Sequence, residues 1–163
     1  MAISLALVAV LALAACDDDE DDGGDAAPTP ADGEAPTGEV AVTLNDFAVI
    51  PDQTSVSAGS VTFDAINDGP SPHELVVVTL GEGQTSDPAT GDLPIGEAGD
   101  FEGRVDEDAL EAEDSLLGAI EEEDLPDGAS ASLTLTLEAG DHALICNIPG
   151  HYAAGMWADF TVE

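Results

Sequence analysis

Four residues of the types that bind copper occur at a spacing that could place them around one ion. The segment Cys146-Asn147-Ile148-Pro149-Gly150-His151-Tyr152-Ala153-Ala154-Gly155-Met156 reads C-x4-H-x4-M, and His73 lies far upstream. One thiolate, two imidazoles and one thioether form the ligand set of a trigonal His2Cys copper site with a weak axial methionine. The sequence therefore predicts one mononuclear copper site held by His73, Cys146, His151 and Met156.

Each ligand type suits a site that exchanges one electron between Cu(I) and Cu(II). A soft thiolate binds Cu(I), imidazoles serve both oxidation states, and a distant thioether leaves little to rearrange. Four protein ligands leave no position for a substrate, so we expect an electron carrier and not an enzyme. The H-x-H motifs of multicopper oxidases are absent. A copper-carrying or copper-buffering lipoprotein is the alternative, although the chain lacks the Met or His clusters of copper carriers.

Short stretches with the alternation of β-strands surround these ligands. Turn signals such as Asn67-Asp68-Gly69-Pro70 separate them. The predicted strands cover residues 40–44, 54–57, 61–65, 75–80, 131–137, 143–146 and 157–162. Many short strands at this spacing predict an antiparallel β-sandwich. Cys146 ends one strand, Met156 precedes the next, and His73 precedes the strand 75–80, so the metal is expected at one end of the sandwich.

The same residues resemble the cupredoxins, or type 1 blue copper proteins. The resemblance rests on Asn67-Asp68-Gly69 ahead of His73 and on the Pro149-Gly150-His151 and Ala154-Gly155-Met156 segments of the loop. The C-x4-H-x4-M spacing looks most like that of rusticyanin and sulfocyanin. Apart from an acidic insertion, the resemblance covers residues 40–163. It implies a Greek-key β-sandwich, one copper ion and single-electron transfer.

The resemblance also implies which neighbours tune the copper site. In cupredoxins the sulfur commonly accepts a backbone N–H from the residue after the first histidine, here Glu74. A second N–H comes from two residues past the cysteine, here Ile148, whose N–H is free because the proline follows it. Asn67 is expected beside His73 as a further neighbour of the ligands.

Electrons are expected to pass through the exposed edge of His151 to a redox protein such as a cytochrome, a respiratory complex or a reductase. We expect an uncharged contact surface around this edge. Its predicted members are Pro70, Pro72, Ile148, Pro149, Gly150, Tyr152, Ala153 and Ala154.

The domain that carries the copper site is expected to be a monomer spanning residues 39–163. Residues 81–125 interrupt its strand pattern, because they are acidic and rich in loop-forming residues. We expect them to form a long insertion over one edge or end of the sandwich. Within the insertion, a short helix at 106–113 and a short strand at 116–120 are predicted.

The N-terminal apolar stretch, residues 1–15, precedes Cys16 in the sequence Leu13-Ala14-Ala15-Cys16, which resembles the lipobox of bacterial and archaeal lipoproteins. The resemblance implies a signal peptide, a lipid on Cys16 and anchoring to the outer face of the cell membrane. An uncleaved anchor helix is the alternative and would leave the domain on the same side. Residues 16–38, acidic and then rich in Gly, Ala, Pro and Thr, are expected to be a disordered tether.

The charge balance of the chain is extreme. It carries 36 acidic residues and one basic residue, Arg104, for a formal net charge of -35. Such a surface repels nucleic acid and anionic lipid. It also repels itself, and dissolved salt screens that repulsion. The composition therefore resembles that of a halophile's protein.

Salt should consequently stabilise the fold. The Debye length falls from about 10 Å at 0.1 M to about 3 Å at 1 M. We expect the thermal unfolding midpoint to rise between about 0.1 M and about 2 M KCl, which circular dichroism measures. A flat or falling midpoint would remove the salt-adaptation hypothesis.

Overall fold

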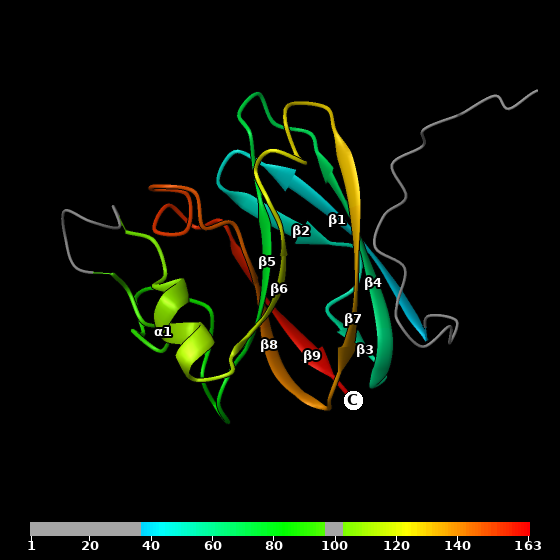
Figure 1. Ribbon diagram of the computed structural model, residues 1–163, viewed down its shortest axis with the longest axis vertical. Helices are drawn as coiled ribbons and strands as arrows, with labels where there is room; N and C mark the ends of the chain where they lie inside the picture. The colour runs from blue at the N-terminus through cyan, green and yellow to red at the C-terminus, as the bar shows by residue number, and fades with distance from the viewer. Residues whose placement is uncertain (1–36, 97–102) are drawn as a thin grey trace, which may run out of the picture.

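The computed structural model describes residues 37–96 and 103–163, whose strands form two packed sheets (Figure 1). The elements in chain order are β1 (Gly38–Asn45), β2 (Ala48–Pro51), β3 (Ser55–Val56), β4 (Gly59–Asn67), β5 (Leu75–Thr79), α1 (Glu107–Ala112), β6 (Leu116–Ile120), β7 (Ser130–Leu137), β8 (Gly140–Ile145) and β9 (Trp157–Val162). One sheet has the order β2-β1-β4-β7 and the other β3-β9-β8-β5-β6. The predicted β-sandwich is confirmed. The pairs β1–β4 and β3–β9 are parallel, whereas a wholly antiparallel sandwich was expected.

Alternation along the strands builds the main core between the two sheets. In β1, Val40, Val42 and Leu44 are fully buried, while the residues between them face outward. The same core contains Cys146 and Met156. Both sulfur atoms of the predicted copper site therefore belong to residues anchored in close-packed apolar surroundings, where side-chain positions are well defined.

The predicted elements agree with the observed ones to within two residues at each end, apart from two larger differences. The predicted strand 116–120 is β6, and the predicted helix corresponds to α1, which Asp106 caps by accepting a hydrogen bond from the Ala109 N–H at 3.1 Å. Strand β2 was not predicted, because Ala48–Pro51 shows no clear alternation. Strand β8 begins at Gly140, three residues earlier than predicted, because Gly140 already pairs with Val162.

The insertion covers the outer face of the five-stranded sheet as well as one of its edges, where only an edge or end was expected. Its residues Leu93, Val105 and Leu110 pack against the outward side chains of β5 and β8. Figure 1 shows α1 and its flanking loops on this side. The physical reason is visible in β5, whose residues 75–78 are apolar on both faces and need cover on both. The insertion also supplies β6, the edge strand beside β5.

The predicted signal peptide, Cys16 and nearly all of the 16–38 tether lie outside the described residues. Within the described ranges, no helix is long and apolar enough to cross a membrane.

Candidate metal centre

The pairing of β5 with β8 brings His73 close to Cys146. Val76 pairs with Ile145 in an antiparallel ladder, so the residues just before β5 lie beside those just after β8. The backbone N–H of Glu74 donates a hydrogen bond to the Cys146 sulfur. His73 and Cys146 are both fully buried. Two residues 73 positions apart in sequence thus meet at one end of the sandwich.

A compact loop from β8 to β9 carries the other two predicted ligands. The Cys146 N–H donates to the Met156 carbonyl at 3.0 Å, and the Met156 N–H donates to the His151 carbonyl at 3.1 Å. The His151 N–H in turn donates to the Ile148 carbonyl at 2.9 Å. Met156 is fully buried, whereas His151 is partly exposed. The loop therefore leaves His151 as the member of the set that reaches the surface.

The separation of two predicted ligands suits a trigonal metal site. Cys146 Sγ lies 3.6 Å from His151 Nδ1. Metal–sulfur and metal–nitrogen bonds of about 2.3 and about 2.0 Å, set about 120° apart, would separate these atoms by about 3.7 Å. The rings of His73 and His151 meet edge to face, with centroids 5.3 Å apart. Cys146 and His151 therefore lie at a separation that suits a shared metal ion, with the His73 ring beside them.

The amide of Asn67 fixes the loop that carries His73. Its Nδ2 donates to the carbonyls of Ser71 and Leu125, at 2.7 and 2.8 Å. Its Oδ1 accepts from the Gly69 N–H and lies 2.8 Å from His73 Nδ1. Asn67 is itself fully buried. Its four contacts satisfy the whole amide, so the His73 ring is held in one orientation.

The other ring nitrogen of His73 is buried and has no hydrogen-bond partner among the described residues. Asp46 Oδ1 lies 3.3 Å from it without a well-aligned hydrogen bond, and would form an ion pair with it only if the ring were protonated. Burial, reinforced by repulsion from His151, lowers the pKa of His73, and the Asp46 carboxylate opposes this only in part. The imidazole is therefore neutral at neutral pH, with one nitrogen oriented by Asn67 and the other available to a metal.

Comparisons with known proteins decide the family. Residues 36–163 match the family described as copper binding proteins, plastocyanin/azurin family. The chain belongs to this family. Its cofactor is one copper ion, and the chemistry of these cupredoxins is copper-based electron transfer. No curated protein sequence matches the chain significantly.

Two solved structures of auracyanins show the same fold. Reduced auracyanin from the photosynthetic bacterium Roseiflexus castenholzii is 22% identical with a TM-score of 0.50, over 80% of this chain and 99% of its own. Auracyanin B is 28% identical with a TM-score of 0.51, over 80% and 91% of the two chains. Rusticyanin from Thiobacillus ferrooxidans is 15% identical with a TM-score of 0.47, over 79% of each chain.

Two backbone N–H groups hold the cysteine sulfur of this cupredoxin. Burial raises the pKa of the Cys146 thiol to about 11, while hydrogen bonds from the N–H groups of Glu74 and Ile148 act to lower it. Without a metal the thiol is therefore protonated at neutral pH, and a metal must displace that proton. Both donors are those expected from the sequence.

The insertion brings carboxylates close to the site, which the sequence did not indicate. The Glu74 carboxylate accepts the Asn147 backbone N–H and lies near Glu107 and Glu121. Burial, together with these like charges, raises the pKa of Glu74 to about 7. Glu107 lies 33 residues after Glu74 in the sequence, so its position beside Glu74 could not be predicted without the fold.

The surface around His151 differs from the expected one at two positions. Tyr152 was expected on the uncharged surface, but it is buried, and its hydroxyl donates to the Ser86 carbonyl at 2.8 Å. Phe47 was not expected there. Its ring packs edge to face on His151, with centroids 5.7 Å apart, and it is 54% exposed. Its φ of 65° is unusual for a bulky residue, so the β1–β2 turn holds this ring at the surface against a local strain.

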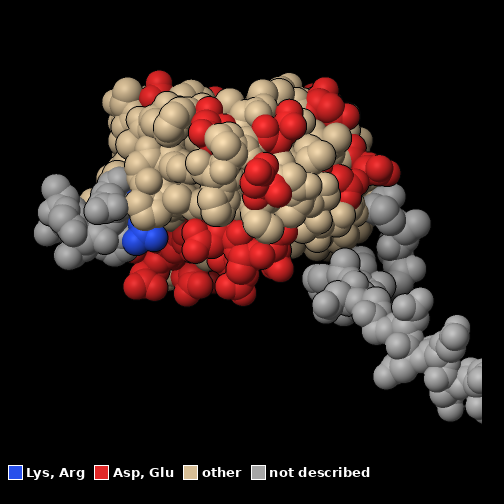
Figure 2. Space-filling view, turned by 90° about the horizontal axis from the view of Figure 1, so that it is seen from above, with Lys and Arg blue, Asp and Glu red and all other residues tan. Residues whose placement is uncertain are grey.

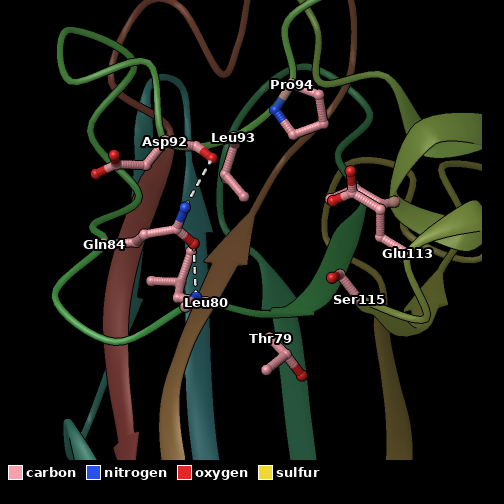
Figure 3. A pocket seen from close by; sticks show the side chains of 10 residues that line it. Thr79, Leu80, Gln84, Asp92, Leu93, Pro94, Glu113 and Ser115 are labelled. Carbon is pink, nitrogen blue, oxygen red and sulfur yellow. Dashed lines mark hydrogen bonds between the residues drawn. The ribbon is translucent and has the colours of Figure 1, made fainter.

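One cavity among the described residues lies away from the predicted ligands. It has a volume of about 310 Å³ and lies between the start of the insertion and the end of α1 (Figure 3). Gln84 in its wall accepts the Gly81 N–H at 2.6 Å and donates to the Asp92 carbonyl at 3.5 Å. None of the predicted copper ligands lines it.

Gly69 leaves the space that the His73 ring occupies. A Cβ at position 69 would lie 2.7 Å from His73 Cε1 and 3.1 Å from the Asp46 backbone nitrogen. We expect Gly69→Ala to displace the imidazole and to weaken copper binding about 10- to 100-fold, as for changes next to metal ligands. Competition with a chelator measures the affinity. Gly38→Ala is the control, because its nearest contact would be an ordinary 3.5 Å. Equal affinities in the two variants would contradict this role.

Ile148→Pro removes one N–H from the sulfur. Hydrogen bonds draw electron density from the thiolate and favour Cu(I), so their loss should lower the midpoint potential. A hydrogen bond to a charged group contributes about 1.5–3 kcal/mol, of which only the part that differs between oxidation states matters. A one-electron couple shifts by about 59 mV for each tenfold change in its equilibrium constant, so the midpoint potential should fall by an amount on the order of tens of millivolts.

Voltammetry of the copper-loaded protein measures this shift, and Ile148→Val, which keeps the N–H, should match the wild type. A proline variant with an intact visible spectrum and an unchanged or higher potential would show that the Ile148 N–H does not tune the site.

Proposed function

We propose that this cupredoxin is a membrane-tethered carrier of single electrons whose copper ion is held by His73, Cys146, His151 and Met156. The observation that carries the proposal is the 3.6 Å approach of Cys146 Sγ to His151 Nδ1, next to the His73 ring. When bound there, copper supplies a one-electron couple between Cu(I) and Cu(II). The protein itself has no catalytic role in this proposal.

The protein residues keep the site rigid and dry. Asn67 orients His73, and the N–H groups of Glu74 and Ile148 fix the sulfur. His73, Cys146 and Met156 are 0% exposed, so water reaches none of their side chains. Rigid, buried ligands limit the rearrangement that accompanies electron transfer, which favours a fast carrier.

Electrons would enter and leave through His151, the partly exposed member of the set. Exposed and uncharged residues beside it are Phe47, which packs on its ring, and Pro149, Ala153 and Ala154 of its own loop, while the exposed Pro70 and Pro72 belong to the segment that leads into His73. Figure 2 shows acidic side chains gathered most densely along one side of the upper face, with separate acidic groups scattered over the rest. Redox encounters use small interfaces, and an uncharged contact lets a redox protein approach this acidic molecule. We propose a cytochrome, a respiratory complex or a reductase as the partner of a monomeric carrier.

The proposed attachment of the protein to the membrane rests on the lipobox-like sequence that ends at Cys16. We propose that a lipid on this cysteine anchors the protein to the outer face of the cell membrane. Mass spectrometry of the protein from its native host should find acyl chains on a processed N-terminus, and Cys16→Ala should lose both features. An identical mass shift in wild type and variant would favour an uncleaved helical anchor instead.

Electron self-exchange tests the carrier function. The copper-loaded protein should give a reversible one-electron wave and rapid self-exchange by NMR line broadening, measured in about 2 M KCl to screen repulsion. Phe47→Ala should slow self-exchange several-fold, because Phe47 packs on His151. Ile66→Ala is the control, since Ile66 is an apolar residue of similar exposure, 43%, on the outer face of β4. Slow self-exchange combined with rapid metal loss to a chelator would favour a copper buffer.

A further inference from the structure

Two residues of the ligand loop have their side chains anchored in the insertion, and each directly follows a proposed copper ligand. Asn147 follows Cys146, and Tyr152 follows His151. Asn147 is 3% exposed and Tyr152 is 1% exposed. The loop therefore has two sides: the ligands meet one another on the first, and Asn147 and Tyr152 contact the insertion on the second.

The Asn147 amide binds the insertion much as a neighbouring strand would. Its Oδ1 accepts the Val105 N–H at 2.6 Å, and its Nδ2 donates to the Val105 carbonyl at 3.0 Å. Nδ2 also donates to the Glu107 carboxylate at 2.6 Å. Because the amide is buried, movement of the loop away from Val105 would leave polar groups unsatisfied, which is unfavourable.

The Tyr152 hydroxyl forms the second anchor. It donates to the carbonyl of Ser86, a residue that is itself fully buried. The N–H and hydroxyl of Ser86 both donate to the Asp159 carboxylate at 2.7 Å. Asp159 lies in β9, which begins directly after Met156. The segment that receives Tyr152 is thus itself attached to the sandwich.

The insertion and the loop are also in close van der Waals contact. The Tyr152 ring belongs to the apolar cluster of the insertion that contains Leu93 and Leu110. A Cβ added at Gly103 would lie 2.9 Å from the Ala153 Cβ, so the insertion backbone runs directly against the loop. Contacts at Asn147, Tyr152 and Ala153 therefore cover the loop from its start to near its end.

We propose that the insertion is a clamp that holds the ligand loop in its copper-binding conformation before the metal binds, with Asn147 and Tyr152 as positioning residues. The proposal rests on the ligand assignment proposed above. Ordering a loop of this length costs conformational entropy. Anchors present in the metal-free protein offset that cost during folding, so that the metal meets a loop that is already ordered.

Amide hydrogen exchange in the metal-free full-length protein tests the clamp. The reporters are the N–H groups of His151, Ala154, Gly155 and Met156, which are hydrogen-bonded within the loop. We expect Tyr152→Phe, which removes one hydroxyl, to speed their exchange about 2- to 10-fold, and Asn147→Ala to speed it further. The amides of β4 and β7 should exchange as in the wild type.

Thr134→Val serves as the matched control. It removes a side-chain hydrogen bond to Thr62, on the outer face of the other sheet, and should leave the loop unchanged. In the copper-loaded protein, Asn147→Ala should shift the midpoint potential, and Thr134→Val should not.

Loop exchange at the wild-type rate in both variants would overturn the clamp. Equal acceleration throughout the sandwich would also overturn it, because Asn147 and Tyr152 would then support only global stability. If the wild-type protein bound no copper through His73 and Cys146, the ligand assignment would fail. The exchange rates of the metal-free protein would still report on the clamp separately.

Discussion

The pairing register of β5 with β8 is the constraint on which the site depends. It sets Val76 opposite Ile145, and this places Glu74 where its N–H reaches the Cys146 sulfur. A slip of one residue would turn the alternating side chains of β5 to the opposite faces. Both faces of β5 are apolar and buried, one in the main core and the other under the insertion, so close packing on both sides, and not alternation of polarity, opposes such a slip.

The acidic insertion is strongly charged on its surface and apolar where it packs on the sheet. It contributes much of the negative charge near α1, yet it also supplies the apolar cluster that covers the sheet. Its carboxylates gather on one side, and like charges there raise the pKa of Glu121 in addition to the effect of burial.

Much of this arrangement could be predicted from the sequence, because local patterns carry it. Alternation indicates most strands, and the sequence from Asp106 onward indicates α1. Ligand types at the spacing of Cys146, His151 and Met156 indicate the metal. Contacts between distant segments could not be predicted in this way. Tyr152 looked like a surface residue because nothing nearby in sequence shows that Ser86 receives its hydroxyl. Phe47 was missed because its turn shows no signal for contact with His151.

One signal in the sequence could have placed the insertion. A strand with apolar residues on both faces, as in Leu75–Thr79, needs cover on both sides, and the insertion is the segment that directly follows it.

The central claim is that the Cys146 thiolate binds copper together with His73 and His151. Electron paramagnetic resonance of the Cu(II)-loaded full-length protein, beside Cys146→Ser, tests it most directly. The account predicts a blue wild-type protein with the narrow copper hyperfine splitting of a thiolate-bound site, and a colourless variant. A wide splitting typical of tetragonal Cu(II) in the wild type, or blue colour that persists in Cys146→Ser, would contradict it.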